Sequence, residues 1–234
     1  MVNGVSQDVG KRAEAKQDGI ATRGISIEHH ACYNRENHTS NGTGKTTQRD
    51  LLGRYLLAKG YPVIITKEPT DGPYGMKIRE LYRHRSRFSR EEELELFLAD
   101  RRQHVKNLLL PSLMEGKIIL CDRYYFSTAA YQGALGLDPE IILAQNDFAP
   151  EPHLVLLFQA SLDIGLKRIT AGRGETLNNF EQREFLEKVA TIFSAIKRPF
   201  IRNIDASGTM EDIHRQVVGC VSDLLQPLRT ASPD

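Results

Sequence analysis

The sequence predicts an α/β fold in which a five-stranded, mainly parallel sheet is covered by helices on both faces. Short apolar, β-branched runs alternate along the chain with longer segments in which apolar residues recur at helical spacing. Strands that alternate with helices in this way form parallel sheets with helices packed on the two faces. A chain of 234 residues is also long enough to bury one large core without disulfides.

Composition narrows the functional classes. Lys and Arg total 31 against 30 Asp and Glu, so the chain lacks the excess positive charge that drives nonspecific binding to nucleic acid or membranes. Cys32, Cys121 and Cys220 are widely spaced and odd in number, which favours free thiols in a reducing compartment. No apolar run approaches the roughly 20 residues of a membrane span, and the N-terminus lacks a signal-peptide pattern. We therefore expect a cytoplasmic protein with no nucleic-acid or membrane partner.

The chain is predicted to hold a single domain over residues 25–228. Residues 1–24 contain few large apolar side chains among many polar ones, so we expect a disordered tail there. Ile25 to Glu28 alternates like a strand, whereas residues 29–40 are polar and show no periodicity. We interpret residues 29–40 as an atypical surface insertion.

Three histidines and one cysteine in this insertion could suggest a zinc site. Their spacing matches no familiar ligand pattern, and no second cysteine pair follows. A surface insertion is therefore the favoured interpretation of the segment that contains His29, His30, Cys32 and His38.

The stretch GTGKTT at residues 42–47 is a glycine-rich turn that leads straight into a helical pattern. Glycines let successive backbone N–H groups converge on phosphate oxygens, Lys45 adds a mobile positive charge, and Thr46 offers a hydroxyl to Mg²⁺. The full motif also begins with a glycine, and Thr39 stands at that position. The turn predicts a phosphate-binding site with one departure from the standard pattern.

The elements after this turn follow the alternation. The helical pattern from Lys45 ends at Gly60, and residues 61–66 (YPVIIT) form a buried parallel strand. Residues 67–75 are rich in Pro and Gly and are predicted to form a loop at the carboxyl end of that strand, where open α/β sheets bind ligands. Ser89, followed by acidic residues, is the expected N-cap of a long helix that reaches Leu109.

The second half of the chain repeats the alternation and adds a glycine-flanked tract that we expect to act as a lid. The predicted elements are a strand at 117–121, a strand at 153–158, a helix at 161–171, the lid at 172–180, a helix at 181–197, a strand at 200–204 and a helix at 210–225.

Phe97 and Arg101 lie four residues apart on the long helix, so they project from one face. A ring and a guanidinium placed in this way could hold a planar ligand together. The alternative is that Phe97 belongs to the core and Arg101 is an exposed partner for Glu93 or Glu95. Periodicity alone leaves both possibilities open.

Asp122 stands at the carboxyl tip of an apolar strand. P-loop enzymes use an Asp at this position to hold or orient Mg²⁺ and its waters. The alternative is a structural Asp that caps the following helix. Residues 125–136 (YFSTAAYQGALG) place hydroxyls and amides between small residues, which suits hydrogen bonding to a small ligand.

Five ordered motifs together resemble thymidylate kinase, a P-loop family of nucleoside monophosphate kinases. The resemblance extends from Gly42 to the final helix. It is carried by GTGKTTQ at 42–48, TKEPTDGPYG at 66–75, ELFLADRRQHV at 95–105, DRYYFSTAAYQGALGLD at 122–138 and IDAS at 204–207.

The resemblance implies a P-loop NTPase-like three-layer α/β/α domain with a short lid, which transfers the γ-phosphoryl of ATP to dTMP with the help of Mg²⁺. It also implies a homodimer. The implied catalytic residues are Lys45, Asp122, Arg123 and Arg173, with Arg168 as a further lid candidate. The implied ATP-binding residues are Asn41, Gly42, Thr43, Gly44, Lys45, Thr46 and Thr47, and the implied metal-binding residues are Thr46 and Asp122.

For the acceptor dTMP, the resemblance places Phe97 against the thymine face and Arg101 at an exocyclic oxygen of the base. Tyr131 corresponds to the tyrosine that crowds the ribose 2′ position and would reject ribonucleotides. The implied substrate-binding residues are Lys67, Pro69, Phe97, Arg101, Arg123, Thr128, Tyr131 and Gln132.

The chain departs from the family pattern at three positions. Thr39 replaces the first glycine of the turn, Asn41 replaces an acidic residue, and Lys67 replaces an arginine, so a point charge would meet the monophosphate. These departures leave two alternatives: a nucleotide-binding member of the same fold with impaired catalysis, and a kinase for another pyrimidine monophosphate.

Overall fold

The computed structural model describes residues 23–29, 45–84, 87–160 and 179–225, and the structural statements below concern these residues. In chain order, the elements are β1 (Arg23–His29), α1 (Lys45–Ala58), β2 (Val63–Lys67), α2 (Pro73–Arg83), α3 (Arg90–His104), the π-helical turn η2 (Val105–Leu109), α4 (Leu110–Met114), β3 (Ile118–Asp122), α5 (Tyr125–Ala134), α6 (Pro139–Ala144), β4 (Leu154–Gln159), α8 (Asn179–Ala195), β5 (Ile201–Asp205) and α9 (Met210–Leu225).

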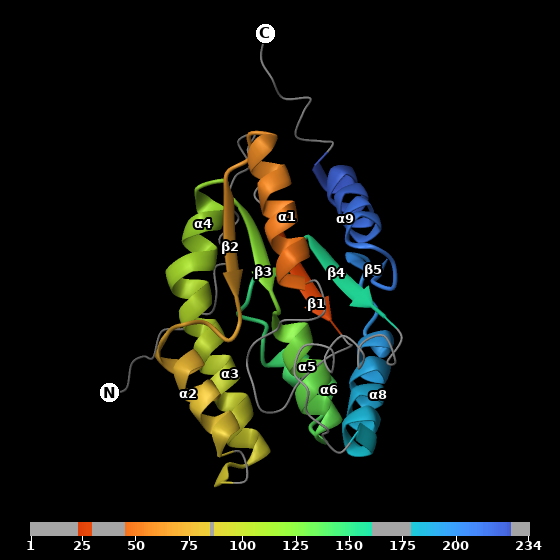
Figure 1. Cartoon of the computed structure of the whole chain (residues 1–234). Helices are drawn as coiled ribbons and strands as arrows, with labels where there is room; N and C mark the ends of the chain where they lie inside the picture. Colours follow the sequence, from red (N-terminus) through yellow and green to blue (C-terminus); the bar gives the residue numbers. More distant parts are fainter. Residues whose placement is uncertain (1–22, 30–44, 85–86, 161–178, 226–234) are drawn as a thin grey trace, which may run out of the picture.

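The five strands form one parallel sheet in the order β2-β3-β1-β4-β5, which confirms the predicted fold class (Figure 1). Strand β1 lies in the centre, where Ile25 pairs with Leu120 of β3 on one side and Leu154 of β4 on the other. β1 ends at His29, one residue later than the sequence predicts. The carboxyl ends of all five strands therefore meet at one edge of the sheet.

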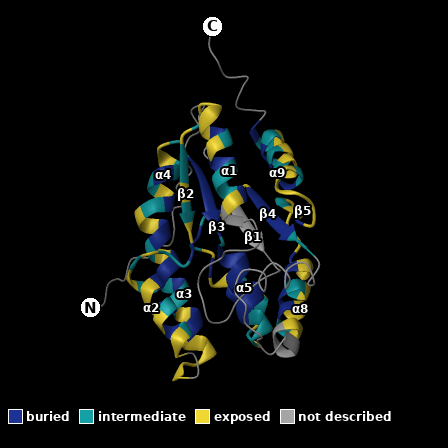
Figure 2. Ribbon diagram, viewed as in Figure 1, coloured by how far each residue is buried: buried dark blue, intermediate teal, exposed yellow. Residues whose placement is uncertain are grey.

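Strands β3 and β4 contribute alternate side chains to two apolar clusters, one on each face of the sheet. Leu120 and Leu156 pack with the residues of α1 and α9, whereas Cys121 and Leu157 pack with those of α3, α5 and α8. Figure 1 shows α1 and α9 together on one face, and Figure 2 shows that the inward sides of the helices are buried. These are the three layers of an α/β/α domain.

The prediction of a loop over 67–75 is wrong for its last three residues, which belong to helix α2. The loop ends at Gly72, and Pro73 opens the helix at a position where a missing N–H costs nothing. Gly75 is required in its first turn, because a Cβ there would lie 1.9 Å from the Thr70 carbonyl oxygen. Two of the Pro and Gly residues that suggest a loop, Pro73 and Gly75, therefore lie in the first turn of a helix, which packs directly against the backbone of the preceding loop.

The predicted long helix is confirmed, and its N-cap is Ser89. The Ser89 side chain accepts the N–H of Glu92, and the Glu92 carboxylate accepts the N–H of Ser89, which makes a capping box. After His104 the chain passes through η2 into α4. Pro111 has no N–H to donate into this ladder, and the wider π turn before it accommodates the proline ring.

The segment 125–136, expected only to carry ligand-binding groups, forms α5 up to Ala134. The predicted helix over 161–171, lid residues 172–178, tail residues 1–22 and insertion residues 30–40 lie outside the described residues. The last two residues of the predicted tail, Arg23 and Gly24, open β1, and the last two of the predicted lid, residues 179 and 180, open α8. Two of the cysteines lie in the described part, where Cys121 is buried, Cys220 is partly buried, and both are free thiols. Cys32 lies outside it.

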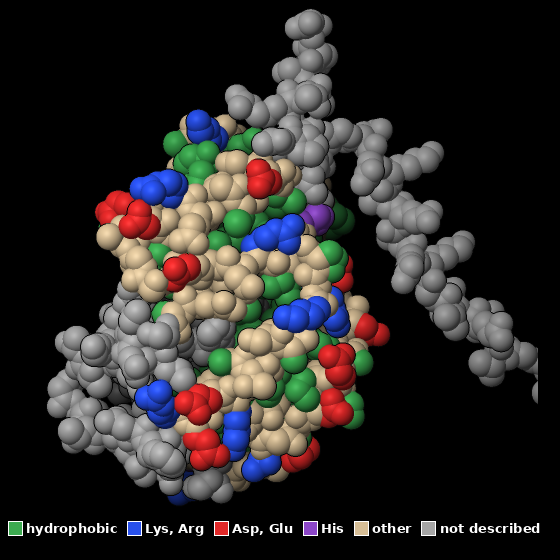
Figure 3. Space-filling view, turned by 90° about the vertical axis from the view of Figure 1, so that its right-hand side faces the viewer, with side chains coloured by type: hydrophobic (Ala, Val, Ile, Leu, Met, Phe, Trp, Pro, Cys, Tyr) green, Lys and Arg blue, Asp and Glu red, His purple; other side chains and the backbone are tan. Residues whose placement is uncertain are grey.

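Charged side chains of both signs are interspersed on the face shown in Figure 3, as expected from the nearly equal numbers of acidic and basic residues. Among the described helices, none is both long enough and apolar enough to cross a membrane.

Candidate active site

One face of α3 carries polar residues where the helix meets the carboxyl edge of the sheet. Glu93, Phe97, Asp100, Arg101 and His104 recur at spacings of three and four, so they form a single stripe along the helix. Four of the five are polar and are at most 5% exposed. Buried polar side chains require partners, and each of these four has one.

Arg101 is held by three different elements. Its Nε and Nη2 donate to Oε2 of Glu68 at 2.8 and 2.6 Å, in the loop after β2. Nη2 also donates to Thr128 Oγ1 on α5 at 3.0 Å, and Nη1 donates to Asn146 Oδ1 at 2.6 Å. The guanidinium carbon lies 5.3 Å from the centroid of the Tyr124 ring. The alternative of Arg101 as an exposed partner for surface glutamates is therefore wrong, because Arg101 is only 1% exposed.

Glu68 supplies the negative charge that balances this buried guanidinium and offsets the free-energy cost of burying it. Its second oxygen, Oε1, lies 2.9 Å from His104 Nδ1. Burial by itself raises the pKa of Glu68, but the charge of Arg101 and the contacts with His104 outweigh burial and hold that pKa below its usual range. Glu68 therefore stays ionised, and the ion pair persists at neutral pH.

The loop between β2 and α2 is tied to α3 by a second carboxylate. Asp100 accepts the backbone N–H of Thr70 at 2.8 Å and the Thr70 hydroxyl at 2.6 Å. At the outer side of the loop, Lys67 Nζ lies 3.2 Å from Asp71, which also accepts from Arg79 at 2.6 Å. Lys67 is half-exposed, so this surface pair leaves it able to meet a ligand.

Asp122 ends β3 and differs from the acids on α3. It is 8% exposed, and its Oδ1 has no hydrogen-bond partner among the described residues. Oδ2 lies 3.9 Å from Nη1 of Arg49, whose Nε and Nη2 both donate to Asp50. The N-cap of α5 is Tyr124 and carries no side-chain cap bond, so the alternative of Asp122 as the cap is not what the structure shows.

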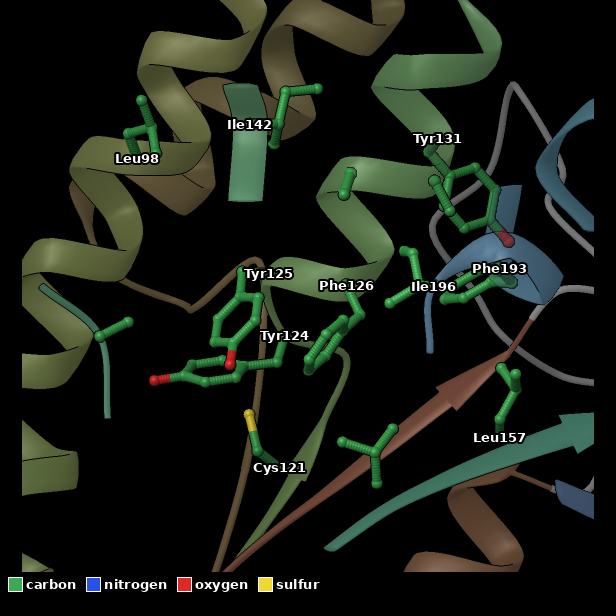
Figure 4. Close-up of a cluster of buried hydrophobic side chains, with 14 of the residues drawn as sticks. Leu98, Cys121, Tyr124, Tyr125, Phe126, Tyr131, Ile142, Leu157, Phe193 and Ile196 are labelled. Carbon is green, nitrogen blue, oxygen red and sulfur yellow. The ribbon is translucent and has the colours of Figure 1, made fainter. Parts of the chain in front are cut away.

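Arg123 follows Asp122 with φ of 69°, in the left-handed region that non-glycine residues rarely adopt. This backbone turn accompanies a contact in which the Arg123 guanidinium carbon lies 5.1 Å from the centroid of the Tyr131 ring. Tyr131 is buried beside Phe185 and Phe193 of α8, as Figure 4 shows for Phe193. Strain of this kind gathers at functional sites.

Gln132 on α5 is bonded to the polar stripe of α3, and Phe97 is the one apolar member of that stripe. Gln132 Nε2 donates to Glu93 at 2.7 Å, and within the described part of the chain its Oε1 is a buried acceptor with no donor. Phe97 is partly exposed and belongs to neither apolar cluster of the described residues. The alternative of Phe97 as a core residue is therefore not supported by its packing.

The structure thus brings together most of the predicted acceptor-side residues at one edge of the sheet. Pro69 follows a cis peptide bond with Glu68 in the same loop. The predicted phosphate turn is described only in part: Lys45 and Thr46 open α1, but only their backbone is described, while Thr47 is exposed. The predicted residues outside the described ranges are Thr39, Asn41, Gly42, Thr43, Gly44, Arg168 and Arg173.

Sequence reasoning missed Glu68, Asp100, His104 and Asn146 as site residues. Asp100 and His104 could have been found, because they interrupt the apolar face of α3 at the spacing of Phe97 and Arg101. Glu68 and Asn146 are 33 and 45 residues from Arg101 in sequence, and only the tertiary structure joins them to it. Among the described residues, no three His, Cys, Asp or Glu side chains are grouped as metal ligands.

Comparison with known proteins adds an independent observation. A family model described as thymidylate kinase matches residues 40–217. The thymidylate kinase of Desulfotalea psychrophila is 54% identical over 187 residues, which cover 80% of this chain and 93% of the relative. The thymidylate kinase of Xanthomonas campestris pv. campestris is 42% identical over 189 residues, covering 79% and 82%, and that of Xylella fastidiosa strain M12 is 41% identical over 185 residues, covering 79% and 84%.

Proposed function

Because the chain belongs to the thymidylate kinase family, we propose that it transfers the γ-phosphoryl group of ATP to dTMP, giving dTDP and ADP. The observation that carries this proposal beyond the family match is the Arg101 site. A buried guanidinium is held there one helical turn from the partly exposed Phe97 ring. Gln132, one helical turn from Thr128 on α5, has a buried amide oxygen without a donor among the described residues. Such a site suits a flat base that presents both a hydrogen-bond acceptor and a donor.

Thymine has this pattern of an acceptor oxygen beside an N–H. A guanidinium has five N–H donors, and four bonds of Arg101 to the described residues leave one N–H on Nη1 for the oxygen. Gln132 Oε1 is an acceptor suited to the N–H of the base, and Phe97 offers a ring face for stacking. Thr128, which bonds Arg101, adds a hydroxyl at the same place.

The sugar and phosphate of dTMP would lie toward the sheet edge. Arg123 would bridge the acceptor phosphate and the transferring group, while Lys67 would add a point charge from the loop that contains Pro69. Tyr131 would crowd the ribose 2′ position and favour deoxyribose. The contact between Arg123 and Tyr131 supports this arrangement, because it places the proposed phosphate-binding residue next to the proposed sugar-selecting residue.

ATP would be bound by the turn from Asn41 to Thr47, where Lys45 neutralises phosphate charge, and Arg173 would close over the phosphates from the lid. The chemistry of Asp122 fits Mg²⁺, because a buried carboxylate oxygen at a strand tip, without a donor among the described residues, is the hard ligand this cation prefers. The hydroxyl of Thr46 would be a second ligand of the same ion. When bound, Mg²⁺ would neutralise charge on the phosphoryl oxygens. The chain's own residues align donor and acceptor and exclude water.

We further propose a cytoplasmic homodimer, as the family resemblance implies. The free thiols of Cys121 and Cys220 support a reducing compartment. Size-exclusion chromatography with light scattering tests the dimer, which is expected to have twice the mass of one chain.

An assay that couples ADP release to a visible signal tests the proposed function with dTMP, dUMP, UMP and CMP as acceptors. We expect the highest kcat/KM with dTMP, and we expect Lys45→Ala to abolish turnover. Retained ATP binding with no turnover of any acceptor would favour the catalytically impaired alternative. Faster turnover of another pyrimidine monophosphate would replace dTMP as the substrate.

A further inference from the structure

The ring of His104 joins two groups that lie on different sides of it. Nδ1 lies 2.9 Å from Glu68 Oε1, and Nε2 lies 2.8 Å from the Thr66 hydroxyl on β2. His104 and Glu68 are both 5% exposed, so water does not compete freely for these contacts. The ring therefore connects the sheet to the carboxylate that holds Arg101.

The direction of these hydrogen bonds follows from the chemistry of the partners. An ionised carboxylate only accepts, so Nδ1 of His104 carries the proton and donates to Glu68. In the neutral ring Nε2 then accepts from the Thr66 hydroxyl, and in the charged ring it donates to that hydroxyl instead. The bond from Nδ1 to Glu68 is the same in both states.

Glu68 is consequently held through both of its oxygens. Arg101 donates twice to Oε2, and His104 donates to Oε1. The last torsion of a glutamate side chain is broad, so a carboxylate held on one oxygen alone retains rotational freedom. With His104 present, the carboxylate plane is fixed, and the guanidinium bonded to it is fixed in turn.

We propose that His104 is a positioning residue for base recognition, which acts through Glu68 to set the orientation of the Arg101 guanidinium toward the pyrimidine base. The inference rests on the proposed function, in which Arg101 meets an exocyclic oxygen of dTMP. His104 itself touches neither the base nor the transferring phosphoryl group in this account. Its removal is expected to weaken recognition of the base while leaving ATP binding and the chemical step largely intact.

Three variants separate positioning from simple stabilisation. His104→Leu removes both hydrogen bonds, His104→Asn keeps an amide N–H near the position of Nδ1, and Thr66→Val removes only the contact with Nε2. Steady-state kinetics of the full chain with dTMP and with dCMP give KM and kcat for each variant. The variants are compared below the lowest unfolding midpoint, which thermal denaturation provides.

For His104→Leu we expect KM for dTMP to rise about tenfold, the size of one lost hydrogen bond to a charged group, with kcat and KM for ATP within about twofold of wild type. The preference for dTMP over dCMP falls, because a loosely held guanidinium distinguishes an oxygen from an amino group less well. His104→Asn recovers most of the loss, and Thr66→Val raises KM for dTMP by about two- to threefold.

The inference is overturned if His104→Leu lowers kcat while KM for dTMP stays unchanged, or if KM rises equally for dTMP and ATP. It also fails if His104→Asn is no better than His104→Leu. Should His104→Leu not fold, the other two variants decide, since a KM for dTMP equal to wild type in both contradicts positioning. Failure of wild type itself to phosphorylate dTMP would instead refute the proposed function.

Discussion

Glu68 and Asp122 are two buried carboxylates at the tips of neighbouring strands, and their surroundings are opposite. The backbone N–H of Glu68 donates to the carbonyl of Asp122 at 3.0 Å, so the two residues share one location. One oxygen of Glu68 accepts from Arg101 and the other from His104. Asp122 has one oxygen with no partner in the described part of the chain and only a distant cation, Arg49 at 3.9 Å, near the other.

This difference indicates different functions for the two acids. A buried carboxylate whose bonds are all satisfied by the protein holds other side chains in place. A buried carboxylate with an oxygen left over carries a cost in free energy, which a bound cation lowers. We therefore propose that Glu68 orients the base-binding residues and that Asp122 serves the phosphoryl-transfer site.

The largest effect is expected for Asp122→Asn. Loss of the carboxylate removes the proposed metal contact, so kcat is expected to fall by about 100- to 1,000-fold. Stability is expected to stay the same or increase, because a buried charge without a full set of partners disappears. Coupled kinetics and urea denaturation measure the two quantities.

The exposed Asp223 on α9 provides the matched control, and Asp223→Asn is expected to leave both quantities at wild-type values. A variant Asp122→Asn that keeps wild-type kcat would contradict the assignment of Asp122.

Glu68→Gln is expected to have the opposite pattern. The change leaves the buried Arg101 without its counter-charge, which costs about 3 kcal/mol in the free energy of unfolding. KM for dTMP rises because the guanidinium loses its anchor, whereas kcat changes less than in Asp122→Asn. Urea denaturation measures the free energy of unfolding. A loss smaller than about 1 kcal/mol would show that the ion pair between Glu68 and Arg101 is not needed to hold the site together.

The sequence was sufficient for the five strands, for helices α1, α3, α8 and α9, and for those site residues that recur at helical spacing or end a strand. Strand runs, helix periodicity and helix-start residues are local signals, and the five strands and the N-cap of α3 at Ser89 follow from them. Helix α2 was missed because its Pro and Gly residues also signal a loop. The partners Glu68 and Asn146 could not be predicted, since their link to Arg101 depends on how distant segments pack.

The stability that Glu68 provides is expected to depend on pH. The pKa of Glu68 is lowered in the folded protein from its ordinary value of 4.5, so its contribution is complete above that value and is lost as pH falls through the lowered pKa. The difference in unfolding free energy between wild type and Glu68→Gln should therefore be constant from about pH 7 to about pH 5 and shrink below about pH 4. Urea denaturation at several pH values measures it. A difference that grows on acidification would reverse the sign and refute the lowered pKa.

The smallest effect is expected for Glu184→Gln on α8. Glu184 pairs with Lys188 at 2.8 Å, but both side chains are more than half exposed to solvent. Water and salt screen such a pair, so the unfolding midpoint is expected to equal that of wild type within error. If Glu184→Gln destabilised the protein as much as Glu68→Gln, burial would not be what distinguishes the Glu68 site.

Calorimetric titration of dTMP in the absence of ATP tests the division between the two carboxylates most directly. Asp122→Asn is expected to bind dTMP with the wild-type Kd, whereas Glu68→Gln is expected to bind it about tenfold more weakly. Equal loss of dTMP affinity in the two variants would contradict this division, because both acids would then serve one and the same site.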